Sequence, residues 1–404
     1  MAGPVLALEG GEPLRRAPYP SWPALGEGDI DRVRAVLGSS NWGGSHTVVT
    51  DFERVFAVSH DARFGIAVSS GTMALELAMH ASGIGPGDEV IVPAHSFVAT
   101  ATAVSRAGAT PVFADIERDT FNIDPGAVAD GVSDRTRAMI PVHFGGVLAD
   151  MDRLARLAQE HGLSVIEDAA HAHGAERRGF RAGGSGRAGV FSFQNSKAMT
   201  AGEGGILITR DEELAAKARS ITNAGRIKGR GWFEHFELGT NLRMTALQAA
   251  LLLAQLGRLG AQIRRRAYNF AAFAVCLGDV EGFHLQQAPD GPTVQTRYIV
   301  PGYIDGKRFG CDRDRFVAAV QAEGVPVRPF YPHPLYANPL YERLPHRALP
   351  CPVAEQATKD SFWLPMQLFM GTEEDAADAA RAIKKVHQAC QASTPSRTNG
   401  TPSA

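Results

Sequence analysis

The sequence predicts an α/β fold with a mainly parallel seven-stranded sheet, followed by a smaller C-terminal α+β domain. Short apolar runs alternate with helical stretches, which is the βαβ rhythm of a parallel sheet with helices on both faces. That rhythm stops after Asp211, where a long helix rich in Leu and Arg follows. The predicted units are a tail at 1–20, a large domain at 21–255, a small domain at 256–392 and a disordered tail at 393–404.

Seven short apolar runs are the predicted strands of the large sheet, because buried strands have this length and composition. In chain order they are Gly65–Ser69, Glu89–Pro93, Thr110–Asp115, Arg137–His143, Ser164–Asp168, Gly189–Phe193 and Gly205–Thr209. Helical periodicity fills most of the gaps and continues in the C-terminal part. The predicted helices are Thr72–Ser82, Ala149–His161, Thr245–Ala272, Asp312–Glu323 and Thr372–Gln391, with one further strand at Thr296–Tyr303.

Composition and charge exclude several classes of protein. The 41 basic and 43 acidic residues nearly cancel, so the chain has no overall basic field for a nucleic acid. No apolar run is long enough to cross a bilayer, and the first twenty residues contain no signal peptide. The four cysteines form no CxxC pair, which argues against a zinc ribbon and indicates reduced thiols in the cytoplasm.

Lys197 is the first candidate for chemistry. It lies in the segment VFSFQNSKAMTAGEGG (190–205), between an apolar strand and a glycine-rich turn, in a chain that has only seven lysines. A lysine amine that is desolvated in a cavity loses part of its affinity for the proton and can form a Schiff base with an aldehyde. From the residues alone, an ordinary surface lysine in a turn explains the pattern equally well.

Two further segments place polar groups where α/β proteins bind ligands. Ser69-Ser70-Gly71-Thr72 joins a strand to a helix N-terminus, which suits a phosphate, although a plain helix cap has the same residues. Asp168 ends a buried strand, where its carboxylate would pair with a cation such as a protonated pyridine nitrogen, or cap the next turn. A metal site made by Asp168, His171 and His173 is a weaker alternative, because no further ligand supports it.

A glycine run and a proline-rich segment are less specific. Gly184–Gly189 matches GxGxxG, but it precedes a strand instead of joining a strand to a helix, so it does not indicate dinucleotide binding. The segment Val327–Leu340 places Tyr331 and His333 among rigid turns, where they can line a polar substrate pocket or pack as a surface loop.

Five segments, in this order and spacing, resemble the DegT/DnrJ/EryC1/StrS family of pyridoxal-phosphate-dependent sugar aminotransferases. They are SSGTMAL, VPAHSFVATA, IEDAAHAHGA, FSFQNSKAMTAGEGG and LGTNLRMTALQAALLLAQL, and the resemblance runs from about residue 20 to about residue 391. It implies fold type I of the enzymes that use this cofactor, and a homodimer whose active sites lie at the subunit interface.

The resemblance also implies roles for particular residues. Lys197 is expected to form the Schiff base with pyridoxal 5'-phosphate, and Asp168 to pair with the pyridinium nitrogen. The other expected cofactor contacts are Phe97 stacked on the ring, His171 close to it, Gly71, Thr72 and Ser192 at the phosphate, and Asn241 reaching the phosphate from the neighbouring subunit. The expected substrate contacts are Trp42 and Gly43 in the turn 41–44, together with Tyr331 and His333.

The function that this resemblance implies is transfer of an amino group from L-glutamine or L-glutamate to a keto-cyclitol or keto-sugar, in the biosynthesis of an aminoglycoside-type product. One alternative is a dehydrating and aromatising enzyme like 3-amino-5-hydroxybenzoate synthase, whose lysine loop is similar to Phe193–Lys197. Another is a partner subunit with the same fold and no turnover. No metal, nucleic acid or membrane partner is expected.

Overall fold

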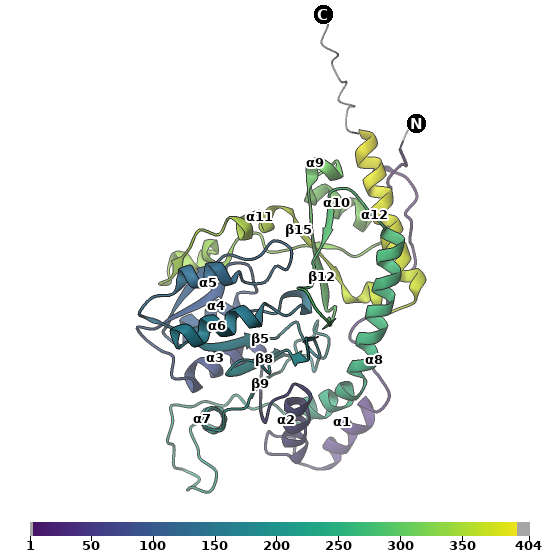
Figure 1. Cartoon of the computed structure of the whole chain (residues 1–404). Helices are drawn as coiled ribbons and strands as arrows, with labels where there is room; N and C mark the ends of the chain where they lie inside the picture. The colour runs from purple at the N-terminus through teal and green to yellow at the C-terminus, as the bar shows by residue number, and fades with distance from the viewer. Residues whose placement is uncertain (1–2, 394–404) are drawn as a thin grey trace, which may run out of the picture.

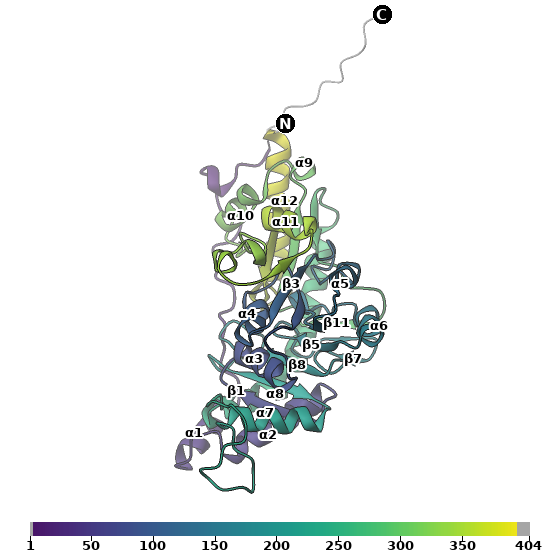
Figure 2. The ribbon, with the colours of Figure 1, turned by 90° about the vertical axis from the view of Figure 1, so that its left-hand side faces the viewer.

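The computed structural model describes residues 3–393 and is built around an eight-stranded sheet with helices on both faces (Figures 1 and 2). All seven predicted strands are present, and the α/β class is confirmed. The predicted number of strands is one too low, because the short strand β14 joins the sheet edge from the C-terminal part of the chain. The order across the sheet is β1 (Phe64–Val68), β9 (Gly205–Thr209), β8 (Ala188–Ser192), β5 (Ser164–Asp168), β4 (Thr136–Met139), β2 (Glu89–Pro93), β3 (Thr110–Ala114) and β14 (Arg347–Ala348).

Strand direction decides where the ligand-binding edge lies. Strand β9 runs antiparallel to both of its neighbours, and the other neighbouring pairs are parallel. The carboxyl ends of β2, β5 and β8 therefore meet at one edge of the sheet, which is the edge where open α/β sheets bind ligands. Asp168 and Ser192 are the last residues of β5 and β8.

Most residues of the central strands are apolar because both faces of the sheet are covered. In β9, Ile206 and Ile208 pack in one core while Leu207 between them packs in another. The helices of this part of the chain are α1 (Asp29–Gly38), α2 (Thr47–Ser59), α3 (Gly71–Ala81), α4 (Ala99–Arg106), α5 (Pro125–Gly131), α6 (Met151–His161) and α7 (Glu212–Thr222). Helices α3 and α6 lie where the sequence predicted them.

Helix α8 (Ala246–Leu277) connects the two parts of the molecule. Thr245 and Gln248 form a capping box at its start. Its first half packs Leu252 into the core beside the large sheet, and its second half packs Phe273 into the core of the C-terminal part. The predicted domain boundary between residues 255 and 256 falls inside this continuous helix, so the division at that position stays a prediction.

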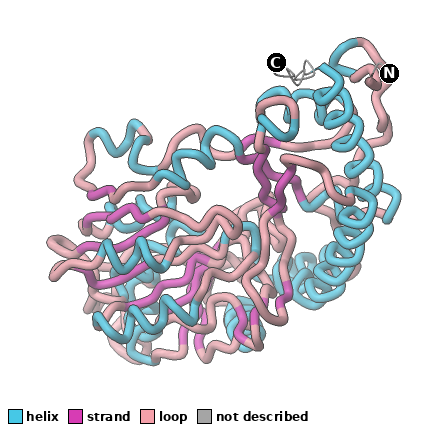
Figure 3. Tube along the Cα trace, turned by 45° about the horizontal axis from the view of Figure 1, so that its top comes forward, coloured by secondary structure: helices cyan, strands magenta, loops and turns pink. Residues whose placement is uncertain are grey.

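The C-terminal part contains a second, antiparallel sheet of four strands, visible beside α8 in Figures 1 and 3. Its order is β10 (Phe283–Leu285), β12 (Ile299–Ile304), β15 (Ser361–Pro365) and β13 (Arg328–Pro329). The helices around it are α9 (Gly306–Phe309), α10 (Arg313–Ala322), α11 (Pro352–Asp360) and α12 (Glu373–Ser393). The predicted C-terminal tail lies outside the described residues except for Ser393, where α12 ends.

Shorter elements complete the fold. A small sheet is formed by β11 (Thr293–Val294), β6 (Glu176–Arg177) and β7 (Phe180–Arg181). Single turns of 3-10 helix are η1 (Ala7–Glu9), η2 (Phe144–Gly146), η3 (Leu335–Ala337), η4 (Pro339–Glu342) and η5 (Met366–Phe369).

The described part of the N-terminal tail, residues 3–20, packs against the C-terminal part. Leu6 is fully buried in the core of the second sheet. The buried carboxylate of Glu323 accepts hydrogen bonds from the amides of Ala7 and Leu14, each at 2.9 Å. Arg15 forms an ion pair with Asp375 at 2.6 Å. This segment is therefore part of the folded molecule.

Candidate active site

Asp168 ends strand β5 with a buried carboxylate. The side chain of Thr100 donates a hydrogen bond to its Oδ2 at 2.8 Å, and the amide of Ala170 donates one to Oδ1 at 3.2 Å. Burial raises the pKa of Asp168, while the two hydrogen bonds and the positive charge of Lys197 act in the opposite direction. A carboxylate in this position needs a cationic partner to remain charged.

Lys197 lies in the loop after β8 and is half-buried. Its Nζ is 4.7 Å from the centroid of the Tyr298 ring, which is a cation–π distance. The indole of Trp22 donates a hydrogen bond to the carbonyl oxygen of Lys197 at 3.0 Å. The hydroxyl oxygens of Ser196 and Tyr298 are 2.8 Å apart. The lysine loop is therefore held by residues that are far away in the sequence.

His171 lies within electrostatic reach of Lys197. Burial lowers the pKa of His171 well below its ordinary value, and the Lys197 ammonium lowers it further. The ring Nδ1 accepts a hydrogen bond from the amide of Gly145 at 3.4 Å, which leaves the proton on Nε2. His171 is therefore a neutral imidazole at pH 7, and it lies near both Lys197 and Tyr298, whose ring centroid is 4.9 Å away.

The residues predicted to hold a phosphate come together at the start of α3. Ser70 caps this helix by accepting a hydrogen bond from the amide of Met73 at 3.2 Å. A Cβ on Gly71 would lie 2.6 Å from the Cβ of Ser192, so glycine is required where the two segments meet. Thr72 lies in the first turn of α3. Free amides, the positive end of the helix and the Ser192 hydroxyl thus share one location.

Aromatic side chains border the same edge. Phe97 follows β2, and 57% of its surface is exposed, so its ring is not used in the core. Tyr331 packs its ring 5.2 Å from that of His95. Burial raises the pKa of Tyr331, and Tyr298 and Asp168 contribute to the shift, which places Tyr331 among the site residues.

The other predicted substrate residues lie elsewhere in the single chain. Trp42 is exposed, and its indole N–H donates to the carbonyl oxygen of Leu37 at 3.2 Å. Gly43 lines a hollow of about 810 Å³ together with the basic segment 226–230. His333 is exposed in a different hollow of about 510 Å³, beside Arg313. Their predicted contacts with substrate stay predictions.

Asn241, predicted to act on a neighbouring subunit, has an exposed side chain. Its Oδ1 accepts a hydrogen bond from the amide of Arg243 at 3.3 Å. The next residue, Leu242, accepts a hydrogen bond from the amide of Ser69 at 2.8 Å. Asn241 thus emerges from beside the start of α3 toward the surface of its own chain.

Glu167 and His143 form a fully buried layer behind Asp168. The His143 Nε2 lies 2.7 Å from Glu167 Oε2, and the His143 Nδ1 accepts a hydrogen bond from the amide of Ala149. The amides of Gly183, Ser185 and Gly186, the last two of which belong to the glycine run 184–189, donate to the same carboxylate. The run that resembles a dinucleotide-binding motif therefore binds a carboxylate of the protein itself.

Three residues at the site were not predicted, namely Thr100, Tyr298 and Trp22. Thr100 lies in VPAHSFVATA, three residues after Phe97, so that motif contained a signal for it. Tyr298 lies in the predicted strand 296–303 and Trp22 follows the N-terminal tail. Neither of these two has a local pattern that points to Lys197. Tyr298 reaches it because α8 returns the chain, and Trp22 reaches it from the N-terminal end of the chain.

The residues present fit pyridoxal 5'-phosphate. The buried carboxylate of Asp168 needs a cation, as the ring nitrogen of this cofactor provides, and Lys197 supplies an amine nearby. The start of α3 suits a phosphate, and the exposed ring of Phe97 is not packed in the core. The metal alternative lacks support, because within residues 3–393 no three His, Cys, Asp or Glu side chains are grouped to hold an ion.

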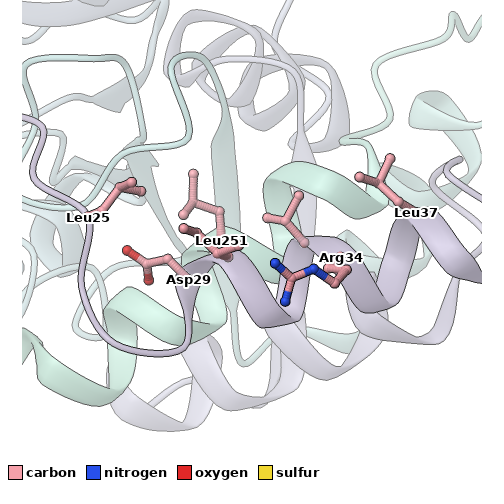
Figure 4. Close-up of a pocket in the computed structure, with 7 residues that line it drawn as sticks. Leu25, Asp29, Arg34, Leu37 and Leu251 are labelled. Carbon is pink, nitrogen blue, oxygen red and sulfur yellow. The ribbon is translucent and has the colours of Figure 1, made fainter.

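Other features of the surface do not belong to this site. An apolar hollow of about 340 Å³ lies between α1 and α8, lined by Leu25, Leu37 and Leu251 (Figure 4). At its edge, Arg258 holds the buried Asp29 by two hydrogen bonds. In the described part of the chain, no helix is long and apolar enough to cross a bilayer.

Comparison with known proteins agrees with this arrangement. The DegT/DnrJ/EryC1/StrS aminotransferase family matches residues 23–384. The L-glutamine:2-deoxy-scyllo-inosose aminotransferase of Streptomyces paromomycinus is 37% identical, over 94% of this chain and 97% of that protein. The 3-amino-5-hydroxybenzoate synthase of Amycolatopsis mediterranei is 34% identical, over 91% and 97%. A crystal structure of 3-amino-5-hydroxybenzoic acid synthase has a TM-score of 0.85 and 33% identity, covering 92% of this chain and 99% of that chain.

Proposed function

This chain belongs to the DegT/DnrJ/EryC1/StrS aminotransferase family, and from that premise we propose its substrates and cofactor. It transfers the amino group of L-glutamine or L-glutamate to a keto-cyclitol or keto-sugar, in the biosynthesis of a secondary metabolite of the aminoglycoside type. The cofactor is pyridoxal 5'-phosphate, held by Lys197 and Asp168. The cytoplasm is the proposed location.

One observation carries the proposal. The buried carboxylate of Asp168 and the amine of Lys197 interact electrostatically at the carboxyl edge of the large sheet, beside the anion-binding start of α3. This arrangement offers an anion for a ring nitrogen, an amine for an aldehyde and free amides for a phosphate. A structural lysine in a turn would require none of these neighbours.

Each residue has a defined task in this chemistry. Pyridoxal phosphate supplies an electron sink that makes the proton on the α-carbon of an amino acid acidic. Asp168 stabilises a positive charge at the carboxyl edge of β5, and Thr100 fixes its orientation. With the cofactor bound, the Nζ of Lys197 would take the α-proton of the donor and would return it to the carbon that comes from the cofactor's aldehyde. The ring of Tyr298 lies against this Nζ, with its centroid 4.7 Å away, and helps to hold the side chain in place.

The identity of the substrates rests on relatives. Members of the family that are 37% identical over nearly the whole chain carry names that specify L-glutamine and a scyllo-inosose. A cyclic ketone with several hydroxyl groups is therefore the proposed acceptor. Tyr331, near Asp168, offers a hydroxyl group for such a ring.

Two measurements test the proposal. Borohydride reduction followed by peptide mapping should label Lys197, and absence of label on that peptide would refute its role. L-glutamine should change the absorbance of the bound cofactor and yield a keto acid in the first half of a ping-pong reaction. A panel of keto-cyclitols and keto-sugars, offered to the aminated enzyme, then identifies the acceptor by which compound restores the original spectrum.

A second candidate is a dehydrating and aromatising reaction like that of 3-amino-5-hydroxybenzoate synthase. This candidate is retained because a structure of that enzyme has a TM-score of 0.85 to this chain. The absorbance experiment separates the two reactions. A bound chromophore that no amino acid changes would favour this second candidate, or a partner subunit without turnover, over transamination.

We also propose that the chain acts as a homodimer whose active sites are shared. The segment between α7 and α8, residues 223–245, extends away from the body of the molecule (Figures 1 and 2). It exposes Trp232, Phe233 and Leu238, and Leu238 is completely exposed. Asn241 lies at the end of this segment, so burial of the segment by a second copy would bring Asn241 toward that copy.

A further inference from the structure

Two of the four cysteines are far apart in sequence but lie side by side in the structure. Cys311 follows α9 and Cys390 lies near the end of α12, 79 residues later. Their sulfur atoms are 2.7 Å apart and share a hydrogen bond. By contrast, the thiols of Cys276 and Cys351 donate to backbone carbonyl oxygens.

The backbone around this thiol pair is held in place on both sides. Gly310 has a φ of +95°, in the left-handed region, and a Cβ there would lie 2.9 Å from the carbonyl carbon of Cys390. The side chain of Gln391 donates a hydrogen bond to the carbonyl oxygen of Arg308 at 2.5 Å. The ring of His387 lies 4.9 Å from that of Phe309. The turn before Cys311 is therefore packed against the last turns of α12.

The two thiols differ in acidity. The hydrogen bond with Cys311 lowers the pKa of Cys390 to about 7, and Arg315 contributes through a hydrogen bond and its charge. The same hydrogen bond raises the pKa of Cys311. Arg315 is itself fixed by an ion pair with Glu9 at 2.6 Å. These contacts favour the thiolate form of Cys390, which is the form that reacts with oxidants.

We propose that Cys311 and Cys390 are a site of reversible disulfide formation, with hydrogen peroxide as the oxidant and a small thiol as the reductant. The Cys390 thiolate attacks one peroxide oxygen, the O–O bond breaks, and hydroxide leaves to give a sulfenic acid. Cys311 then attacks the sulfenic sulfur, and water leaves as the S–S bond forms. In sum, two thiols and one peroxide give one disulfide and two waters.

The burial of the pair decides which oxidant fits. Cys390 is 1% exposed and Cys311 is half-buried. Peroxide is close to water in size, whereas a glutathione-sized disulfide requires a larger opening. The product would tie the end of α12 to the turn after α9, closing a loop of 79 residues that the unfolded chain would otherwise leave open.

The test uses the full-length holoenzyme, first fully reduced and then treated with hydrogen peroxide. Thiol titration in denaturant should fall from four to two, and peptide mapping should find Cys311 joined to Cys390. The Tm should rise by about 5 °C and return after addition of dithiothreitol. The variants Cys311→Ser and Cys390→Ser should show neither the joined peptide nor the Tm shift, while Cys351→Ser and Cys276→Ser should behave as the natural protein does.

Two results would overturn the proposal. One is peroxide oxidation that stops at a single sulfenic or sulfinic acid on Cys390 while Cys311 stays a thiol. The other is a thiol titration that remains at four under conditions that oxidise a small model dithiol. Both readings are independent of turnover and of borohydride labelling at Lys197, so they stand apart from the proposed function.

Discussion

At the scale of single residues, the hydrogen bonds of Asp168 leave its carboxylate able to bind a further positively charged group. Each of its oxygens accepts one hydrogen bond from the protein, and each retains a lone pair for a further donor. Replacing Asp168 by Asn keeps the size of the side chain but removes its charge. We expect turnover to fall by several orders of magnitude while the cofactor, still attached through Lys197, keeps its absorbance. Near-normal turnover of this variant would contradict the role of Asp168.

Thr100 should affect the reaction through Asp168. In Thr100→Val, the buried Oδ2 of Asp168 loses its donor, and an unsatisfied buried acceptor costs about 1–3 kcal/mol. If that energy is lost in the transition state, kcat falls by about 10-fold to 100-fold. Thr100→Ser keeps the hydroxyl and is the matched control. Steady-state kinetics should show the fall in the valine variant alone, and equal losses in both variants would indicate a packing defect instead.

Glu167 makes a pH-dependent contribution to stability. Burial alone would raise the pKa of Glu167, but the hydrogen bonds from His143 and the amides of the glycine run outweigh it and hold the pKa below its ordinary value of 4.5. A depressed carboxyl pKa stabilises the folded state above the unfolded pKa, and this stability is lost as the pH falls through the folded pKa.

The variant Glu167→Gln tests this contribution. It should unfold at lower urea concentration than the natural protein at pH 7, because His143 and the amides lose a charged acceptor. The difference in the free energy of unfolding should shrink as the pH falls below about 4.5. A difference that stays constant as the pH falls from 7 to well below 4.5 would show that charge at Glu167 plays no part.

At the scale of elements, the N-terminal segment depends on one buried carboxylate. Glu323 accepts from the amides of Ala7 and Leu14 and from the Nζ of Lys385 at 2.9 Å. Glu323→Gln removes the charge opposite Lys385 and turns one acceptor atom into a donor, at a cost of about 2–4 kcal/mol. Trypsin should then cut after Arg15 and Arg16 faster than in the natural protein. Glu160→Gln, at an exposed position on α6, should leave the cleavage rate unchanged.

The large sheet could be predicted from sequence because strands buried on both faces are continuous apolar runs. Strand β14 could not, because two residues that pair with β3 have no pattern of their own. Helix α7 did have a signal. Asp211, after which the predicted strand rhythm stops, is the N-cap of this helix, and Leu214, Ala218 and Ile221 follow at helical spacing on its buried face.

At the scale of the whole molecule, some residues of the site could be predicted from sequence and others could not. Asp168 and Ser192 lie at or near the ends of predicted strands, and Gly71 and Lys197 follow such strands, so the parallel topology brings all four to one edge. Tyr298 reaches Lys197 only because α8 returns the chain and the second sheet packs beside the first. Periodicity contains no information on such a long-range approach, and it contains none on a second subunit.

The last prediction is that the segment 223–245 forms the interface between two copies of the chain. A completely exposed leucine among exposed aromatic rings is costly for an isolated chain and typical of an interface. Leu238→Glu places a charge in that interface and should shift the protein from dimer toward monomer in sedimentation experiments. Because Asn241 is proposed to serve the neighbouring subunit, turnover should fall together with the dimer fraction and recover at high protein concentration. Val275→Glu is the control, since Val275 is equally apolar and 85% exposed but lies on α8. A monomeric natural protein with full activity would overturn both the shared site and the role of Asn241.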